Sequence, residues 1–311
     1  MDHAARSSLH ALRNRMGSEA LDRRHTLEER ESVRTHALER HLRHTGQRFR
    51  DSLLEVTFRL FGLYGRGRRN FSRVQLRTLH WDIPGVPESL RGLRILHLSD
   101  LHLGIDSAIG ESVGNVLEGL SYDLCIMTGD FFHRPALPSG LPQRDWITLA
   151  ERIQAPYFGV LGNHDRLADL PLLESTGMRI LLNEACSLTI AGESLWIGGV
   201  DDPRYFRTHD LARVRRAIPT AAFSILLAHD PVMGLEAATH GFPMIFCGHT
   251  HGGQICLPGG IPLVTHTRAP RRLSHGAWRH GDLRGYTSRG TGGGVIPLRF
   301  HCPPEVILHV M

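Results

Sequence analysis

The sequence predicts an α/β or α+β protein, because short β-type runs alternate with helical patterns and Gly/Pro turns from residue 74 onward. Polar clusters directly follow most of these runs, as expected for a sheet whose strand ends carry a functional site. A helical, arginine-rich segment comes first. We therefore expect an N-terminal helical, amphipathic extension over residues 1–70 and one α/β domain over residues 71–311.

The composition is that of a folded globular protein. Of the 311 residues, 41% are hydrophobic and 22% are charged, which excludes a collagen, a wholly disordered chain and a polytopic membrane protein. The five cysteines include no Cys-x-x-Cys pair, so the sequence indicates neither a disulfide framework nor a zinc knuckle. A reducing compartment is therefore favoured.

The formal net charge of +5 is unevenly distributed. Residues 1–90 contain 17 Arg against 11 Asp and Glu, whereas residues 91–311 have a net charge of −1. All 36 basic residues are Arg, which we attribute to genome composition. The positive total therefore does not indicate DNA binding, and no long nucleic-acid partner is expected.

The N-terminal segment combines a helical apolar period with a basic cluster. Apolar residues from Leu38 to Leu63 recur at spacings of three, four and seven. Five arginines then follow before the next acidic residue, Asp82. This pattern favours a helix lying on an anionic membrane surface through residues 53–77. A helix packed on its own domain or in a coiled coil is an equally open reading, and the run is too short to span a bilayer.

Short apolar runs and helical periods set the expected elements of the α/β region. The strand-like runs are Val74–Ile83, Leu93–Leu98, Leu124–Met127, Tyr157–Val160, Leu195–Val200, Phe223–Leu227 and Met244–Cys247. Helical patterns lie at about 108–120, 145–153, 167–176 and 208–217. The sheets are therefore expected to have covered faces.

Five strand-like runs end in carboxylates, imidazoles or an amide. The clusters are Asp100-Leu101-His102, Gly129-Asp130, Gly162-Asn163-His164-Asp165, His229-Asp230 and Gly248-His249-Thr250-His251. In a chain with 21 histidines a single His-x-His is weak evidence for a site. All five clusters, however, follow the same positional rule, because each one comes directly after an apolar strand-like run. We expect them to meet at one sheet edge. Asp, Asn and His together favour divalent Mn, Fe, Zn or Co.

This set of clusters resembles the motifs of the calcineurin-like metallophosphoesterases, in family order and over roughly residues 90–311. The phrases Gly199-Val200-Asp201-Asp202-Pro203, His251-Gly252-Gly253-Gln254 and Ser288-Arg289-Gly290 further resemble the YkuE/YaeI-like branch. The resemblance implies a four-layer α/β/β/α sandwich with two mixed sheets. Residues 71–311 would then be the metallophosphoesterase domain.

The resemblance also implies a centre of two divalent metal ions, with Mn expected to support activity in vitro. Asp130 would bridge the ions. Asp100, His102 and His251 would complete one site, and Asn163, His229 and His249 would complete the other. A hydroxide between the ions would attack phosphorus in line.

Two further residues are assigned catalytic roles by this resemblance. His164 would face the substrate and protonate or stabilise the leaving oxygen, and Asp165 would orient and charge that imidazole. The alternative for Asp165 is a helix cap or turn residue. Turn chemistry is also the expectation for Asp201, Asp202 and Asp230, which are left outside the site.

Substrate contacts are expected from loops beside the metals. Phe131, Phe132, His133 and Arg134 follow the bridging Asp130 and would form an apolar and cationic lip, with Phe132 and Arg134 contacting substrate. Arg289 and Arg299 are candidates for a phosphate contact. Each arginine is equally open to a surface or structural role.

The expected function is a binuclear metal-dependent phosphoesterase acting on a phosphoester or pyrophosphate bond of a small or lipid-linked substrate. UDP-2,3-diacylglucosamine pyrophosphatase activity, as in lipid A synthesis, is the specific alternative. A non-catalytic binding scaffold on the same fold is the third reading. No export signal follows Met1, so a cytoplasmic location is expected, peripheral at the inner face of the membrane if residues 53–77 bind lipid.

Overall fold

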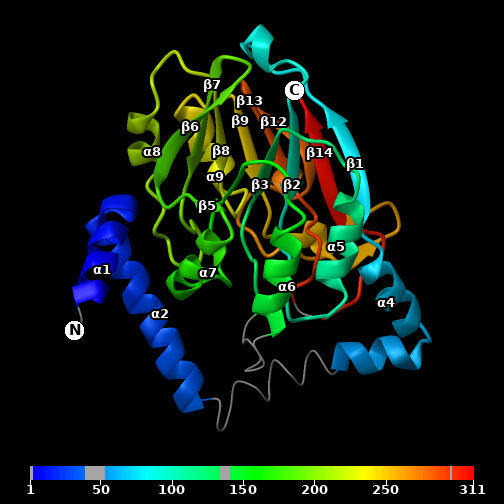
Figure 1. The fold of residues 1–311 in the computed structure, drawn as a ribbon. Helices are drawn as coiled ribbons and strands as arrows, with labels where there is room; N and C mark the ends of the chain where they lie inside the picture. Colours follow the sequence, from blue (N-terminus) through cyan, green and yellow to red (C-terminus); the bar gives the residue numbers. More distant parts are fainter. Residues whose placement is uncertain (1–2, 39–52, 134–140, 295) are drawn as a thin grey trace.

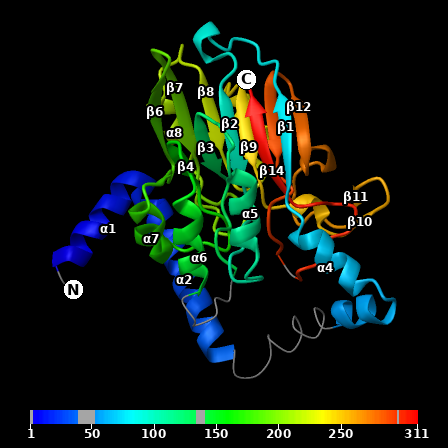
Figure 2. The same ribbon diagram turned by 45° about the vertical axis from the view of Figure 1, so that its right-hand side comes forward.

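Two six-stranded mixed sheets pack face to face in the computed structural model of the chain (Figure 1). The structure describes residues 3–38, 53–133, 141–294 and 296–311. Figure 2 shows α5 (Ile109–Leu117), α6 (Leu141–Ala150) and α7 (Leu170–Ser175) beside the strands of the first sheet. The arrangement places the carboxyl ends of several parallel strands from both sheets at the same end of the molecule.

The first sheet has the strand order β1-β14-β2-β3-β4-β5. Its strands are β1 (Gln75–His80), β14 (Glu305–Val310), β2 (Arg94–Leu98), β3 (Leu124–Met127), β4 (Tyr157–Gly159) and β5 (Arg179–Ile180). The strands from β2 to β5 run parallel, and β14 pairs antiparallel with β2. Because both faces of a parallel sheet are covered, β3 is apolar along its whole length and fully buried.

The second sheet has the strand order β12-β13-β9-β8-β7-β6. Its strands are β12 (Gly276–His280), β13 (Leu283–Thr287), β9 (Met244–Cys247), β8 (Ser224–Leu227), β7 (Glu193–Gly199) and β6 (Glu184–Ile190). The four strands from β13 to β7 are parallel, and the two edge strands pair antiparallel. A short hairpin joins β10 (Cys256–Leu257) to β11 (Ile261–Pro262).

Three apolar cores define four layers. One core lies between the sheets and joins Ile126 of β3 to Ile225 of β8. A second lies under α5, α6 and α7, and a third lies under α8 (Leu211–Ala217) and α9 (Met233–Thr239). In α5 the buried Ile109, Val113 and Leu117 repeat every four residues, which turns one apolar stripe toward the sheet. The predicted α/β/β/α sandwich is confirmed.

The first two helices pack against the sandwich. They are α1 (His3–Met16) and α2 (Ser18–Leu38). Met16 and Leu21 are buried in the core under the first sheet, and Asn183 donates to the Met16 carbonyl oxygen at 3.2 Å. The junction of α1 and α2 is therefore part of the folded domain.

Residues 53–60 are helical and lead through a turn into α4 (Tyr64–Ser72). The Phe58 ring stacks on the Phe300 ring, with centroids 5.0 Å apart. Several apolar side chains of residues 53–63 remain exposed. Within the described ranges, none of the helices has both the length and the apolar character that a membrane span requires.

The predicted strand-like runs correspond to β1, β2, β3, β4, β7, β8 and β9, and the four helical patterns correspond to α5, α6, α7 and α8. The elements that sequence analysis did not predict are β5, β6, α9 and the strands from β10 onward. The apolar period from Leu38 partly falls on residues 39–52, which lie outside the described residues.

Candidate metal centre

The side chains predicted as metal ligands converge where β2, β3, β4, β8 and β9 end. Each follows its strand by a few residues, as the positional rule requires. Except for Asn163, which is half-buried, all are at most 9% exposed. The converging residues are Asp100, His102, Asp130, Asn163, His229, His249 and His251.

The turns that carry these ligands have an unusual backbone. Five of the predicted ligands have φ values between 45° and 71°, namely Asp100, His102, Asp130, His249 and His251. An L-residue in this left-handed region costs roughly 1–2 kcal/mol, and such strain is concentrated at functional sites. Tight packing holds the turns in place, because a Cβ on Gly162 would overlap the Asp130 carboxylate and one on Gly248 would overlap the Ser99 hydroxyl.

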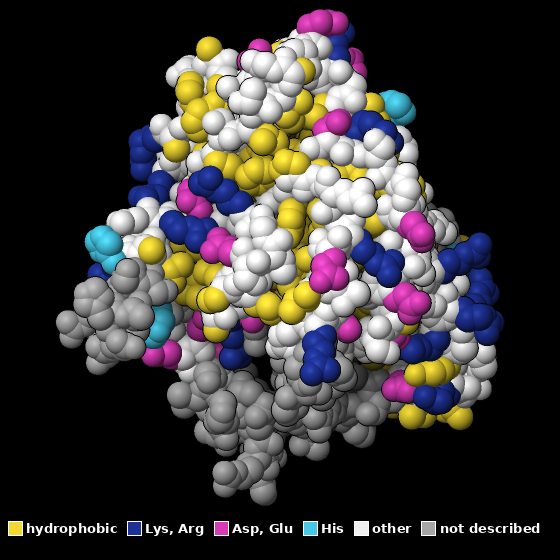
Figure 3. All heavy atoms as spheres, in the orientation of Figure 1, with side chains coloured by type: hydrophobic (Ala, Val, Ile, Leu, Met, Phe, Trp, Pro, Cys, Tyr) yellow, Lys and Arg dark blue, Asp and Glu magenta, His cyan; other side chains and the backbone are white. Residues whose placement is uncertain are grey.

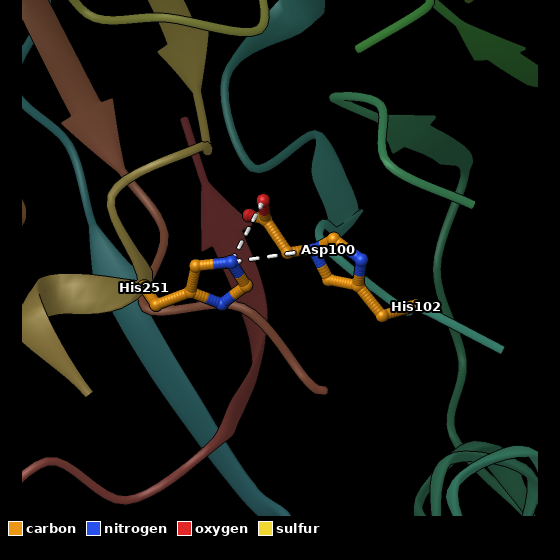
Figure 4. A group of neighbouring side chains, drawn as sticks. All are labelled: Asp100, His102 and His251. Carbon is orange, nitrogen blue, oxygen red and sulfur yellow. Dashed lines mark hydrogen bonds and ion pairs between the residues drawn. The ribbon is translucent and has the colours of Figure 1, made fainter. Parts of the chain in front are cut away.

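Asp100, His102 and His251 form the first ligand group (Figure 4). His251 Nε2 lies 3.2 Å from His102 Nε2 and 3.8 Å from Asp100 Oδ1. The Asp100 carboxylate is fixed by the backbone N–H of His249, at 3.0 Å from Oδ1 and 3.1 Å from Oδ2. Two imidazole nitrogens and a carboxylate that face one another suit a shared cation.

Asp130, His229 and His249 form the second group. His229 Nε2 lies 3.2 Å from Asp130 Oδ2 and 3.1 Å from His249 Nδ1. Asn163 Oδ1 lies 3.1 Å from the same His229 nitrogen. His229 Nδ1 donates to the Thr128 carbonyl oxygen at 2.6 Å, which directs Nε2 at the cluster. Burial acts against the charged ring, but Asp130 and Asp100 hold the pKa of His229 well above its usual value, so a metal at Nε2 would displace a proton.

A third group, His102, Asp130 and His164, joins the other two. Within each of the three groups, one ligand atom per residue lies within 4.8 Å of the others. Asp130 belongs to two groups, with Oδ2 3.4 Å from His102 Nε2 and Oδ1 accepting from the His164 backbone N–H at 2.8 Å. The carboxylate of Asp130 is therefore central to one continuous cluster. Its mixture of carboxylate and imidazole donors fits borderline divalent metals.

The ionisation of the cluster also suits a cation. Burial lowers the pKa of His102 and His251 well below their usual value and that of His249 to about 4, so these rings are neutral ligands at pH 7. Burial acts against ionisation of Asp130, but His229 and His164 hold its pKa well below the ordinary carboxyl range. Burial raises the pKa of Asp100 to about 7, which a bound cation would reverse.

Asp165 lies behind the cluster, with its carboxylate directed at backbone amides. Oδ2 accepts from the N–H groups of Asp130, at 2.7 Å, and Gly162, at 2.8 Å, and Oδ1 accepts from Phe131 at 2.9 Å. These bonds tie the turn after β3 to the turn after β4. The sequence leaves Asp165 open between orienting His164 and a turn role. The observed contacts are those of a residue that positions Asp130.

Asp230 is a second supporting carboxylate, although the sequence indicated only a turn residue. It is fully buried, and Oδ2 lies 3.4 Å from His249 Nε2, the ring nitrogen that points away from the cluster. Oδ1 accepts from the Val232 backbone N–H at 2.8 Å and from the Thr267 hydroxyl at 2.6 Å. A carboxylate at the outer nitrogen orients a metal-binding imidazole. The sequence signal that could have revealed this role is that Asp230 directly follows His229.

A hydrogen-bonded chain of side chains, all buried except the partly buried Trp81, also ends on the cluster. Its directions are mutually consistent, because the Trp81 indole can only donate, and each following residue accepts from one neighbour and donates to the next. The chain runs through Trp81, His309, His97, Thr128, Ser99 and the Asp100 carboxylate. It fixes Asp100 Oδ2 by a 2.6 Å bond from the Ser99 hydroxyl.

The N-terminal extension reaches the same loops. Arg24 of α2 is fully buried, pairs with Asp201 and Glu28, and donates to the Asp165 carbonyl oxygen at 2.6 Å. Glu28 accepts from the Leu167 backbone N–H at 3.1 Å. Helix α2 therefore braces the loop that carries Asn163 and His164. Sequence analysis had no signal for this contact, because the partners are more than 100 residues apart in the chain.

The predicted substrate lip is only partly present. Phe131 and Phe132 are 1% and 2% exposed and pack in the core under the first sheet, so the expectation that they form an apolar lip is wrong. Their backbone is drawn inward by pairing with the segment at Leu103. His133 does face the cluster, with its ring centroid 5.8 Å from that of His102. The predicted Arg134 lies outside the described residues.

The two other predicted arginines have different surroundings. Arg289 is half-buried and packs beside Gly252 in the turn after His251. Arg299 is fully buried and donates to backbone carbonyl groups, among them Gly292 and Arg289, so its guanidinium is not available for direct substrate contact.

Comparison with known proteins decides the family. The model of the calcineurin-like phosphoesterases matches residues 93–253, which contain all the converging residues. The chain belongs to the calcineurin-like phosphoesterase family. This membership makes it a metal-binding hydrolase of phosphoester bonds, and the resemblance seen in the sequence, including the YkuE/YaeI-like branch, is confirmed.

Three curated relatives of this calcineurin-like phosphoesterase align over most of their own length. The uncharacterized metallophosphoesterase YkoQ of Bacillus subtilis is 28% identical, over 78% of this chain and 93% of YkoQ. YkuE of the same organism is 29% identical, over 73% of this chain and 81% of YkuE. The UDP-2,3-diacylglucosamine pyrophosphatase LpxG of Chlamydia trachomatis is 24% identical, over 76% of this chain and 88% of LpxG.

Proposed function

We propose that the protein is a binuclear metal-dependent phosphoesterase, with Asp130 as the bridging ligand. The observation that carries this proposal is the place of Asp130 in two of the three overlapping ligand groups. Asp100, His102 and His251 would hold one ion, and Asn163, His229 and His249 the other. When bound, two divalent ions would supply Lewis acidity and a hydroxide nucleophile for in-line attack on phosphorus.

The remaining residues have supporting tasks in this proposal. His164 lies beside His102, with ring centroids 4.9 Å apart, and is only partly buried, so it is placed to meet a substrate at the cluster. It would give a proton to the leaving oxygen or stabilise its charge. Asp165 would keep Asp130 in position through the backbone, rather than act on substrate itself.

Hydrolysis of bis-p-nitrophenyl phosphate tests this proposal. Protein loaded with Mn²⁺ should hydrolyse the diester. The same assay is repeated with Fe²⁺, Co²⁺ and Zn²⁺ in place of Mn²⁺. Asp130→Asn should reduce the rate to background, while Asp282→Asn, which removes a carboxylate from a fully exposed loop position, should leave the rate unchanged. No turnover with any of the four metals would leave the non-catalytic scaffold as the better account. Full turnover by Asp130→Asn would contradict Asp130 as the bridging ligand.

A lipid-linked nucleotide-sugar substrate is the more specific candidate. It is supported by the similarity to LpxG, which extends over most of both chains, and by the exposed apolar residues of the segment 53–63. Such a substrate would bring the protein to the inner face of a membrane through residues 53–77. The deciding comparison is the rate with UDP-2,3-diacylglucosamine against simple diesters and cyclic nucleotides, with the uridine product quantified. A rate with the lipid no higher than that with the simple diesters would remove this candidate.

A further inference from the structure

A cationic pocket lies outside the metal centre, between α4, the start of β1 and the loop before β14. Its volume is about 220 Å³. No lining residue is acidic, whereas four are Arg or His. The lining residues are Arg66, Asn70, Arg73, Gln75, Arg299, His301, Cys302 and Pro303. A pocket with these lining residues favours an anionic ligand.

Two of the lining arginines have guanidinium groups available for a ligand. Arg66 and Arg73 are both exposed, and neither has an ion pair or side-chain hydrogen bond with the described part of the chain. By contrast, Arg68 on the same helix pairs with Asp106 at 2.6 Å. Two unengaged guanidinium forks beside one cavity match the terminal oxygens of a phosphate group.

Arg299 adds a buried positive charge to the wall of the pocket. This lining residue is fully buried, and it forms no direct ion pair with the described carboxylates. Its N–H groups instead donate to the carbonyl oxygens of Arg289, at 2.7 Å, Gly290, at 3.2 Å, and Cys302, at 3.3 Å. The negative charges of Asp100 and Glu305 act on this guanidinium from a longer distance. Arg299 therefore adds positive charge to the pocket wall, but its N–H groups are already engaged.

Exposed apolar side chains flank the pocket on two segments that are far apart in the sequence. Residues 53–63 contribute Leu60 and Phe61, which are 80% and 74% exposed. The hairpin of β10 and β11 and the residues after it contribute Leu257, Ile261, Leu263 and Val264, each about half exposed.

Both apolar segments are anchored on Phe300, in the loop that lines the pocket. Phe58 stacks on the Phe300 ring, and the Cys256 backbone N–H donates to the Phe300 carbonyl oxygen at 2.9 Å. Figure 2 shows α4, β10 and β11 at the same side of the molecule. In Figure 3, yellow side chains lie beneath a column of dark blue ones at the lower right, where α4 and the helix before it lie in Figure 1. Apolar and cationic surfaces therefore adjoin one another.

We propose that this pocket binds the phosphate monoester headgroup of an anionic lipid while residues 60–63 and 257–264 enter the surface of the bilayer. A monoester is favoured because its three terminal oxygens leave room for each of the two guanidinium forks to make two hydrogen bonds. A diester has only two terminal oxygens for both forks. The proposal builds on the membrane contact of residues 53–77 proposed above, adds a second inserting segment and a specific headgroup site, and is independent of hydrolytic turnover.

Vesicle co-sedimentation with the full chain tests this proposal. The vesicles contain phosphatidylcholine with either phosphatidic acid, a monoester, or phosphatidylglycerol, a diester, adjusted to equal surface charge. The unmodified protein should bind the phosphatidic acid vesicles more tightly. Arg66→Gln combined with Arg73→Gln should abolish that preference, and Leu263→Ser should weaken binding to both vesicles. Arg69→Gln, which removes a charge from the same helix outside the pocket, should weaken binding at most about fivefold and keep the preference.

Three results would overturn the proposal. An unchanged preference for phosphatidic acid in the double Arg66 and Arg73 variant would show a general electrostatic attraction without a headgroup site. Absence of binding to either kind of vesicle would exclude a lipid as the ligand of the pocket. Protection of residues 66–75 from hydrogen exchange by glycerol 3-phosphate, without vesicle binding, would assign the pocket to a soluble phosphate. Bis-p-nitrophenyl phosphate hydrolysis measured on the same samples without vesicles separates these results from failure of the proposed phosphoesterase activity.

Discussion

The backbone N–H of Asp130 donates to the carboxylate of Asp165, with the nitrogen 2.7 Å from Oδ2. Thus the proposed bridging ligand is held by a residue that follows a different strand. The same oxygen accepts from Gly162, so one buried carboxylate sets the distance between two ligand-bearing turns.

Asp165→Asn should therefore weaken metal binding more than it slows the loaded enzyme. An amide offers one acceptor oxygen where the carboxylate serves three N–H groups, so the Asp130 turn loses part of its support. We expect a loss of about 10–100-fold in metal affinity, as for other residues that support metal ligands. The measurement is diester hydrolysis titrated with Mn²⁺. A kcat that stays low at saturating metal would instead support direct action of Asp165 on His164.

Gly162→Ala should strongly reduce activity. The new methyl group would overlap the Asp130 carboxylate, and displacement of that ligand by about 1 Å can cost about 100-fold in rate. Gly110→Ala in α5 is the matched control, because its methyl group would meet Asp145 at an ordinary 3.6 Å. The control should keep its activity and gain up to about 1 kcal/mol of stability from helix propensity. Similar rates for the two variants would contradict the tight packing described at Asp130.

Acid should destabilise the protein through His97 and His309. Burial lowers the pKa of His97 to about 3 and that of His309 well below its usual value, so the unfolded chain binds protons that the folded chain does not. The contribution of each neutral ring to the free energy of unfolding is fully present above the unfolded pKa of about 6.5. It falls as the pH drops toward 3, by up to about 1.4 kcal/mol per pH unit for each histidine.

Urea unfolding between pH 7 and pH 5 measures this slope. His97→Gln should flatten it, because glutamine does not titrate, although its stability at pH 7 will fall with the loss of the bond to Thr128. His10→Gln on the exposed face of α1 should keep the slope of the unmodified protein. An unchanged slope in the His97 variant would show that this ring is accessible to protons in the folded state.

Arg24→Met should destabilise the whole domain, although Arg24 lies in the N-terminal extension. The substitution leaves the buried Asp201 without its cation and removes the bond to the Asp165 carbonyl oxygen. Breaking a buried ion pair costs about 3–5 kcal/mol in the free energy of unfolding. Arg30→Met, at an exposed position of the same helix, should change that free energy by less than about 0.5 kcal/mol. Equal midpoints of urea unfolding for the two variants would show that α2 is not integral to the fold.

The centre could be predicted from the sequence because its ligands lie at fixed positions after buried strands. Asp100, Asp130 and His229 each follow a run of apolar residues that must be covered on both faces, and the ends of parallel strands meet at one edge. The four-layer sandwich, by contrast, could be predicted only from the family resemblance. Strand order is not encoded in local periodicity, and β14 pairs with β2 from the far end of the chain.

The residues that support the ligands could not be predicted in the same way. Asp165 and Asp230 act through backbone amides and an outer ring nitrogen, and their sequence neighbourhoods are those of ordinary turns. Phe132 was misplaced because an aromatic residue beside a ligand is equally compatible with a substrate lip and with the core. Its 2% exposure is set by helices elsewhere in the chain.

Anomalous diffraction from crystals grown with Mn²⁺ tests the binuclear centre most directly. We predict two peaks about 3.5–4 Å apart, with the Asp130 carboxylate between them, one beside His102 and His251 and the other beside His229 and His249. Two peaks in the unmodified protein and loss of at least one in Asp130→Asn would support the account. A single peak in the unmodified protein, or peaks that do not contact Asp130, would contradict it.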